Sequence, residues 1–194
     1  MNDASAPGEY FDKLYAVLAD PWGYTTSAYE QRKYAATLAT LPRARFKRAF
    51  EPGCSIGVLT RMLARRCTRV VAADVSEISL DRARAWCHGM RNVSFQRMAI
   101  PARWPPGTFD LIVLSEVLYY LSPREVRDTA RSTMRTLRAG GVVIVVNWLG
   151  PTGTARGGDQ VARQFISQAR RLQVIAKRRT VRYRLDVLWR RGPR

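Results

Sequence analysis

The residues best suited to chemistry begin with an acid and two glycines, Glu51, Gly53 and Gly57, within Ala49-Phe50-Glu51-Pro52-Gly53-Cys54-Ser55-Ile56-Gly57. A strand is expected to run directly into this turn, and a helix to follow it. A glycine without Cβ lets the backbone approach a ligand, and a carboxylate accepts hydrogen bonds from an ammonium group or from backbone amides. The spacing therefore predicts either a ligand cradle or a tight turn with no ligand.

Two more acids follow apolar runs of the same kind. Asp74 ends the run Val70-Val71-Ala72-Ala73, about twenty residues beyond the glycines, where doubly wound folds bind the ribose hydroxyls of a nucleotide. Glu116 comes just after the run 109–114, at the carboxyl edge of the expected sheet. A carboxylate there can take or orient a substrate proton, or it can cap a helix or pair with a lid.

The elements that must position these acids alternate between strand and helix from Phe46 onward, which indicates a parallel sheet covered on both faces. Strands are predicted at about 48–51, 70–74, 93–95, 109–114 and 142–148. The capping sequences Ser76-Glu77 and Ser122-Pro123-Arg124-Glu125 open two of the helices, and the second helix is expected to stop at Ala139-Gly140-Gly141.

A helix over 159–171 precedes a β-hairpin over 172–175 and 181–189. In its second strand an apolar face alternates with a basic face, and the basic face is expected to be solvated.

The segment before the sheet reads as a helical lid. A short amphipathic helix near Tyr10–Tyr15 ends at Asp20-Pro21-Trp22-Gly23-Tyr24, and the S-x-x-E sequence at Ser27 opens a helix with Tyr34, Leu38 and Leu41 on one face. We therefore expect one domain over 1–194, with the lid at 1–45 and the core at 46–194.

Composition agrees with one globular domain, because the chain has 194 residues and 46% apolar content. No apolar run approaches the roughly 20 residues of a membrane span, and the first residues lack a secretion signal, so a cytoplasmic location is expected. The cysteines Cys54, Cys67 and Cys87 have no ligand spacing, so neither a disulfide framework nor a metal site is predicted.

The net charge of +18 raises nucleic acid as a possible partner. Only four of the 33 cations are lysines, however, and the arginines are scattered over the predicted helices, strands and tail. Such a skew equally fits a compositional bias of the source genome. A nucleic-acid surface is therefore not favoured, although it stays open.

Taken together, the ordered motifs resemble the class I S-adenosylmethionine (SAM)-dependent methyltransferases. They are Glu51-Pro-Gly53-Cys-Ser-Ile-Gly57, Val71-Ala-Ala-Asp74-Val-Ser, Phe109-Asp110-Leu-Ile-Val-Leu-Ser115-Glu116-Val-Leu-Tyr119-Tyr120-Leu and Leu137-Arg-Ala-Gly140-Gly141. With the leader from Asp20 to Tyr34, the chain resembles the narrower NodS-type family of nodulation N-methyltransferases. That resemblance implies a Rossmann-like fold with a mostly parallel, seven-stranded sheet, an antiparallel C-terminal hairpin and an N-terminal helical lid.

The resemblance also implies a site for SAM, with S-adenosylhomocysteine (SAH) as product. Glu51, Gly53 and Gly57 would hold the methionine moiety, Asp74 the ribose and Val75 one face of the adenine. Cofactor contacts are also expected at Cys54, Ser55, Met98, Ala99 and Ser115. Many relatives place an Asp after the third strand to accept from the adenine amino group, where this chain has Met98-Ala99. A dinucleotide-binding G-x-G-x-x-G would need glycines at Ser55 and Val58, so an NAD enzyme is disfavoured.

For the family's reaction, Glu116 and Tyr119 are the candidate catalytic residues. The acceptor implied by the resemblance is the free amine on the non-reducing glucosamine of a deacetylated chitooligosaccharide. Since sugars stack on aromatic faces, substrate contacts are expected at Trp22, Tyr24, Tyr29, Tyr120 and Trp148, with core packing as the alternative for each. Arg32 and Lys33 either reach the donor carboxylate or belong to a solvated helix face. A methyltransferase of another small molecule or of RNA, and a non-catalytic SAM-fold protein, remain alternatives.

Overall fold

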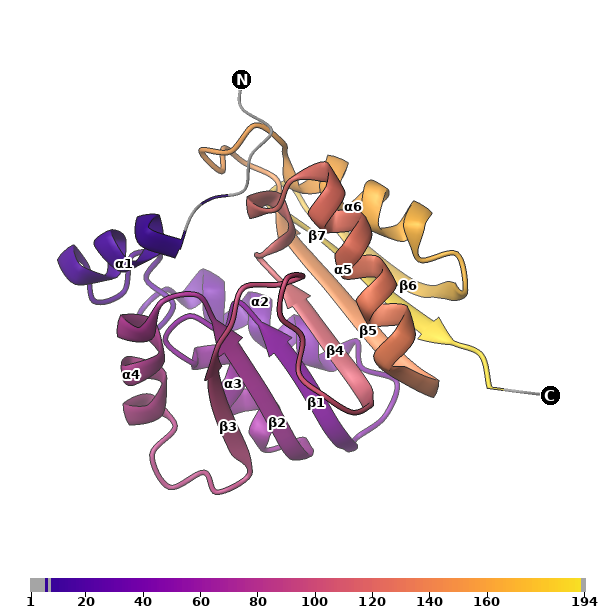
Figure 1. Ribbon diagram of the computed structural model, residues 1–194, viewed down its shortest axis with the longest axis horizontal. Helices are drawn as coiled ribbons and strands as arrows, with labels where there is room; N and C mark the ends of the chain where they lie inside the picture. Colours follow the sequence, from indigo (N-terminus) through magenta and orange to yellow (C-terminus); the bar gives the residue numbers. More distant parts are fainter. Residues whose placement is uncertain (1–5, 7, 193–194) are drawn as a thin grey trace. The chain divides into compact units, whose positions relative to one another are not determined.

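The computed structural model describes residue 6 and residues 8–192, and the chain divides into two compact units (Figure 1). The N-terminal unit is Pro7–Ala99, and the C-terminal unit is Ile100–Arg194 together with Met1–Ala6. Residues 1–5 and 7 of the expected lid lie outside the described residues. The single domain with a lid over 1–45 and a core over 46–194 stays a prediction. Among the described residues, no helix is long and apolar enough to cross a membrane.

The N-terminal unit is a three-stranded parallel sheet with helices. Its elements are α1 (Gly8–Val17), α2 (Ala28–Ala39), β1 (Phe46–Pro52), α3 (Val58–Ala64), β2 (Cys67–Asp74), α4 (Glu77–Trp86) and β3 (Val93–Arg97). The strands lie in the order β3-β2-β1, and both pairings are parallel. Figure 1 shows α4 alongside β3 and α1 alongside α4, and both pairs are in contact. The sheet therefore brings Glu51 and Asp74, near the ends of β1 and β2, to the same edge.

Helix starts in this unit follow the predicted caps, with one difference. The Ser76 side chain accepts from the Ser79 amide at 3.4 Å, and the Ser27 side chain accepts from the Glu30 amide at 3.3 Å. The Glu30 carboxylate instead pairs with Lys33 at 2.8 Å, and both residues are buried. The solvated helix face suggested for Lys33 is therefore wrong, because a buried carboxylate one turn away neutralises the ammonium group; Arg32 is exposed.

The C-terminal unit is a four-stranded mixed sheet. Its elements are β4 (Phe109–Ser115), the 3-10 helix η1 (Leu118–Tyr120), α5 (Pro123–Thr136), β5 (Leu137–Trp148), α6 (Gly158–Gln168), β6 (Leu172–Arg179) and β7 (Tyr183–Arg190). In the order β4-β5-β7-β6, β4 and β5 are parallel while β7 is antiparallel to both of its neighbours. This confirms the antiparallel C-terminal hairpin. With the N-terminal unit, the described residues contain seven strands.

The end of α5 differs from the prediction. Its start is the complete capping box predicted at Ser122 and Glu125, but it ends at Thr136 rather than near the glycine pair. Leu137 already pairs with Phe109 of β4, and the register then shifts before Leu111 pairs with Val142. A Cβ on Gly141 would lie 2.7 Å from the Arg138 carbonyl, so the pair forms an irregularity within β5 rather than a helix stop. Pairing with β4, which the local sequence does not encode, ends the helix early.

The predicted solvated basic face of the last strand is also wrong. β7 lies between β5 and β6, and α6 packs against β5 and β7. The Arg184 Nε donates to Asp186 at 2.6 Å, and Arg184 Nη1 donates to Asp159 of α6 at 3.1 Å. The Asp186 side chain is fully buried, and the hydrogen bond from Arg184 raises the pKa of that guanidinium. The charged side chains on this face therefore fasten α6 to the sheet.

Candidate functional site

The glycine turn at the end of β1 uses left-handed backbone conformations three times. Gly53, Ser55 and Gly57 have φ values of 72°, 51° and 82°. Gly53 is exposed while its neighbours Pro52 and Cys54 are buried, so the turn presents bare backbone at this one point. The Cys54 amide donates to the Ala73 carbonyl of β2 at 2.9 Å, which fixes the turn against the neighbouring strand. The turn is therefore open to a ligand at Gly53.

Gly57 is a glycine for a different reason. A Cβ at this position would lie 3.0 Å from the Ala83 Cβ and 3.1 Å from its Cα on α4. The positive φ and this close approach of α3 and α4 are enough to require glycine at position 57, whether or not a ligand binds there. Glycine at position 57 is therefore explained by the packing of α3 against α4, and its cofactor contact stays a prediction.

Asp74 holds the glycine turn in place. Its Oδ2 accepts from the Ser55 amide at 2.8 Å and its Oδ1 accepts from the Ser76 amide at 3.1 Å. Burial raises the pKa of Asp74, and these backbone hydrogen bonds act in the opposite direction. The carboxylate therefore joins the turn after β1 to the start of α4, which organises the edge where the ribose contact is predicted.

Glu51 lies beneath the same turn and is 3% exposed. Its Oε2 accepts from the Thr60 hydroxyl on α3 at 2.6 Å. Burial is the main cause that raises the pKa of Glu51 from 4.5 to about 8; the Thr60 hydrogen bond lowers it and the Asp74 charge raises it. A buried carboxyl group with a raised pKa ionises near neutral pH only when a nearby cation stabilises the negative charge.

The remaining predicted cofactor residues of this unit follow β2 and β3. Val75 is half-buried, and its carbonyl accepts from Arg97 Nε at 3.1 Å. The Met98 amide donates to the Asp74 carbonyl at 2.8 Å, which places Met98 beside the end of β2, and Ala99 is exposed. The structure thus gathers Val75 and Met98 around Asp74.

In the C-terminal unit, Glu116 links the ends of two strands. It follows the buried Ser115 with a φ of 57°, a conformation uncommon outside glycine. The Glu116 Oε2 accepts from the Tyr119 hydroxyl at 2.9 Å and from the Trp148 amide at 2.8 Å. Ser115 thus ends β4 opposite Val146 of β5, and Glu116, the next residue, bonds to Trp148 at the end of β5. This contact with β5 is not among the readings that the sequence left open for Glu116, which were a proton acceptor, a helix cap and a partner of the lid; the catalytic reading stays a prediction.

Tyr119 and Trp148, which donate to Glu116, bring further aromatic rings to this part of the unit. The Tyr119 and Tyr120 rings lie 4.7 Å apart, and Tyr119 is buried while Tyr120 is half-buried. Trp148 is half-buried, and its indole lies so close to Gly150 that a Cβ there would be 2.5 Å from Nε1. Glu116, Tyr119, Tyr120 and Trp148 are therefore brought together within this unit.

The aromatic residues predicted in the lid pack among themselves. Trp22 stacks on Tyr24 at 5.5 Å between ring centroids and meets Tyr15 edge-on at 5.8 Å, while Lys33 lies 5.7 Å from the Tyr29 centroid. Tyr24 is also close to Tyr34, with 6.0 Å between centroids. These contacts are those of the packing alternative, and substrate contacts at Trp22, Tyr24 and Tyr29 stay predictions.

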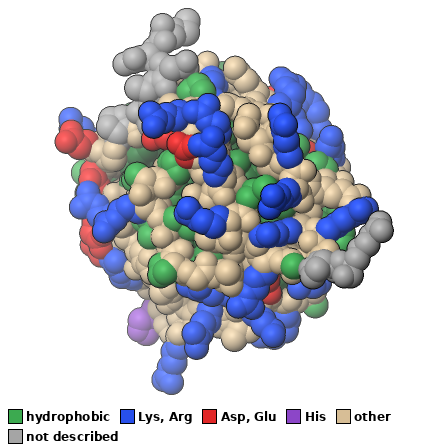
Figure 2. Space-filling model, turned by 45° about the vertical axis from the view of Figure 1, so that its right-hand side comes forward, with side chains coloured by type: hydrophobic (Ala, Val, Ile, Leu, Met, Phe, Trp, Pro, Cys, Tyr) green, Lys and Arg blue, Asp and Glu red, His purple; other side chains and the backbone are tan. Residues whose placement is uncertain are grey.

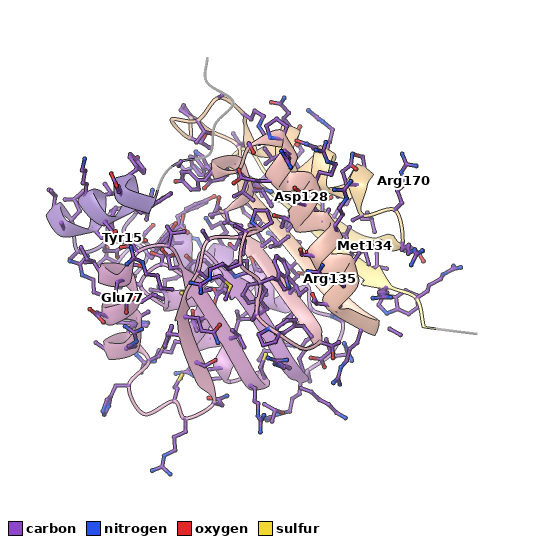
Figure 3. All side chains as sticks on the ribbon, in the orientation of Figure 1. Tyr15, Glu77, Asp128, Met134, Arg135 and Arg170 are labelled. Carbon is purple, nitrogen blue, oxygen red and sulfur yellow. The ribbon has the colours of Figure 1, made fainter. Side chains whose placement is uncertain are left out.

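Besides Thr60, the side chains of Tyr15 and Arg156 also help to position the site and were missed from the sequence. The Tyr15 hydroxyl lies 2.5 Å from the Ser55 hydroxyl in a buried contact, and Figure 3 shows Tyr15 on the side of α1 toward α4. Arg156, also buried, donates to Gln164 Oε1 at 2.6 Å and to the Leu121 carbonyl. It thereby ties the segment after β5 to the segment that carries Tyr119. The one signal in the sequence for the contact with Tyr15 is Ser55, a hydroxyl residue where the commoner G-x-G-x-G pattern has its middle glycine. No local pattern marks Arg156.

Among the described residues, no group of His, Cys, Asp and Glu side chains is arranged to hold a metal ion. The predicted cofactor residues lie in the N-terminal unit except Ser115. The predicted catalytic residues, with Tyr120 and Trp148, lie in the C-terminal unit.

Residues 10–181 match the family described as Nodulation protein S (NodS). The chain belongs to the NodS family. Nodulation protein S of Bradyrhizobium diazoefficiens is 39% identical over 103 residues, which are 53% of this chain and 49% of that protein. The chain spans about half the length of the curated NodS relatives it matches.

Solved structures share the fold of this chain. The N-methyltransferase NodS from Bradyrhizobium japonicum, in complex with SAH, superposes with a TM-score of 0.82 at 22% identity, covering 94% of this chain and 97% of that one. A putative methyltransferase from Pseudomonas syringae is 31% identical with a TM-score of 0.71, covering 84% of this chain and 100% of that one. The Rossmann-like methyltransferase fold predicted from the sequence is therefore confirmed.

Proposed function

We propose that this NodS-family protein is a SAM-dependent N-methyltransferase. The observation that carries the proposal is the turn at Gly53, an exposed glycine at a positive φ between the buried acids Glu51 and Asp74. The solved NodS relative, an N-methyltransferase with SAH bound, supports the same ligand.

The residues at this turn fit SAM chemically. A ligand ammonium group would offset the burial that raises the pKa of Glu51, and the bare backbone at Gly53 leaves room for a ligand to approach. Asp74 would face the ribose hydroxyls, and Val75 and Met98 offer apolar contact for the adenine. The acids and backbone of the turn would thus hold both ends of the cofactor.

SAM supplies a methyl group on a sulfonium, so the acceptor nitrogen must present a free lone pair. In this proposal Glu116 accepts the proton that an ammonium substrate must lose, or orients the neutral amine. Its Oε2 already accepts two hydrogen bonds, which hold the carboxylate, and a carboxylate has about four lone-pair sites in total. Tyr119 and the Trp148 amide would thus keep Glu116 in place.

The proposed acceptor is the amine of the non-reducing glucosamine in a deacetylated chitooligosaccharide. Its support is membership of the NodS family and the paired rings of Tyr119 and Tyr120 that follow Glu116, because sugars pack on aromatic faces. RNA is the second candidate, because the net charge is +18. Figure 2 shows Lys and Arg side chains spread over the visible face with few acidic ones among them.

Cofactor binding is tested by titrating the protein with SAM and SAH in a calorimeter. Gly53→Ala is expected to weaken both by about tenfold or more, because a side chain would occupy the exposed backbone. Gly89→Ala is the matched control, since Gly89 also has a positive φ of 83° with open space around it but lies outside the turn. Equal affinity in all three proteins would contradict the proposed cofactor site.

The acceptor is tested with SAM carrying an isotopically labelled methyl group. Transfer is expected to a deacetylated chitooligosaccharide and not to its fully N-acetylated form, which has no free amine. Transfer to RNA, together with binding that falls steeply as salt is added, would favour the second candidate. If the protein binds SAM but transfers the methyl group neither to the deacetylated chitooligosaccharide nor to RNA, a non-catalytic SAM-fold protein is favoured.

A further inference from the structure

The position after β3 carries no carboxylate for the amino group of an adenine. Met98 and Ala99 follow Arg97 directly; Ala99 has no acceptor in its side chain, and the Met98 thioether is only a weak acceptor. Val75 and Met98 offer only apolar contact on this side. A residue from another element must therefore supply any side-chain acceptor that recognises the adenine amino group.

One face of α1 lies over this edge of the N-terminal unit. Gly8, Asp12 and Tyr15 are spaced i, i+4 and i+7, so they share one side of the helix. At one end, a Cβ on Gly8 would lie 3.8 Å from the Val75 Cβ, and at the other the Tyr15 hydroxyl contacts Ser55. Asp12 stands between these two contacts, so it faces the ends of β2 and β3.

The two oxygens of Asp12 have different environments. Oδ2 pairs with Arg97 Nη2 at 3.4 Å, and the same guanidinium donates to the Val75 carbonyl through Nε at 3.1 Å. Oδ1 is buried and has no hydrogen-bond partner among the described residues. A buried carboxylate oxygen without a donor is costly, so this atom is suited to a ligand donor.

We propose that Asp12 Oδ1 accepts a hydrogen bond from the 6-amino group of the adenine, so that α1 supplies the carboxylate absent after β3. The proposal rests on the proposed SAM-dependent function. Arg97 holds the Asp12 side chain through Oδ2 and leaves Oδ1 for the ligand. Selectivity for adenine thus depends on a residue of the leader as well as on the sheet.

Binding of SAH and of its 6-deamino analogue, in which hydrogen replaces the amino group, tests this hydrogen bond. Wild-type protein is expected to bind SAH about tenfold more tightly than the analogue, as a charge-assisted hydrogen bond predicts. Asp12→Ala is expected to lose about tenfold for SAH and to bind both ligands alike. Asp12→Asn, of the same shape but a weaker acceptor, should show intermediate discrimination and serves where the alanine variant unfolds.

Two further variants separate recognition from helix anchoring. Arg97→Gln removes the ion pair but keeps the acceptor, so it should still distinguish the two ligands. Asp81→Ala, which removes a surface carboxylate paired with Arg84 on α4, should match the wild type. Discrimination retained in Asp12→Ala, or an equal loss for both ligands, would overturn the proposal while leaving the methyltransferase function intact. Failure of the wild type to bind SAH would overturn both.

Discussion

The hydroxyl oxygens of Tyr15 and Ser55 lie 2.5 Å apart, although 40 residues separate them. This contact fastens α1 to the glycine turn that precedes α3. Tyr15→Phe removes one partner and leaves the Ser55 hydroxyl buried without it, so we expect the free energy of unfolding to fall by about 1–3 kcal/mol. Urea denaturation followed by circular dichroism measures the change. Tyr10→Phe is the control, because Tyr10 is 51% exposed, and an equal loss in both variants would contradict the role of the contact.

Glu116→Gln tests the predicted proton acceptor. The amide keeps the shape of the side chain but cannot take a proton, so turnover should fall by about 100-fold or more while SAM affinity is nearly kept. Steady-state kinetics and calorimetry on the same preparation provide both numbers. Tyr119→Phe keeps the carboxylate and removes one of its donors, so a smaller loss is expected. Turnover like the wild type in Glu116→Gln would remove the assigned role.

Asp74→Ala addresses the cofactor edge. Both oxygens of this carboxylate accept backbone amides, so its loss releases Ser55 and Ser76 as well as the predicted ribose contact. We expect SAM affinity to drop by about tenfold or more, since each lost charge-assisted hydrogen bond contributes about 1.5–3 kcal/mol. Calorimetry measures the affinity. The control is Glu77→Ala, because Glu77 is half-exposed and is the first residue of α4, directly after Ser76. This variant should bind SAM like the wild type, and an equal loss of affinity would indicate that both substitutions disturb the fold.

The buried Glu51 predicts how stability changes with pH. Its pKa is about 8 in the folded protein against 4.5 for an ordinary Glu, so the folded state holds a proton that the unfolded state loses between these values. The unfolded state binds fewer protons in that window, and stability should therefore fall as the pH rises from 4.5 to 8. Glu51→Gln should reduce this slope, as denaturation at several pH values would show. Identical slopes would mean that Glu51 is ionised in the folded protein.

The ion pair between Arg184 and Asp186 predicts a large stability effect far from the glycine turn. Asp186 is fully buried, so Asp186→Asn leaves the half-buried guanidinium of Arg184 with only Asp159 to neutralise it. We expect a loss of about 3 kcal/mol in the free energy of unfolding, since breaking a buried pair is strongly destabilising. Asp128→Asn, which breaks the exposed pair with Arg131, should cost less than about 1 kcal/mol. Similar values for both would contradict the burial argument.

The sequence predicted what local patterns encode. Apolar runs located the strands, and Ser76 and Ser122 marked helix starts because a serine cap acts within its own turn. The alternation of strand and helix also predicted the parallel strands, and the last two strand-like runs predicted the C-terminal hairpin, whose antiparallel pairing is confirmed.

Features set by distant partners were not predictable in the same way. The strand start at Leu137 depends on pairing with Phe109, and the burial of Asp186 depends on α6 covering β7. For the site, the sequence named Glu51, Asp74 and Glu116, and also Ser55, Tyr119 and Trp148, which donate hydrogen bonds to Asp74 and Glu116, but it did not name Thr60 or Tyr15. Thr60 and Tyr15 reach the turn only through helix packing, and no local spacing records such contacts.

The most direct test of the proposed function locates the transferred methyl group on the acceptor. Wild-type protein is incubated with SAM carrying a labelled methyl group and a deacetylated chitooligosaccharide, and the product is fragmented by mass spectrometry. We expect the label on the amine nitrogen of the non-reducing glucosamine, with none transferred to the N-acetylated oligosaccharide. Label on a hydroxyl oxygen, or no transfer to any amine although SAM binds, would contradict the assignment as an N-methyltransferase.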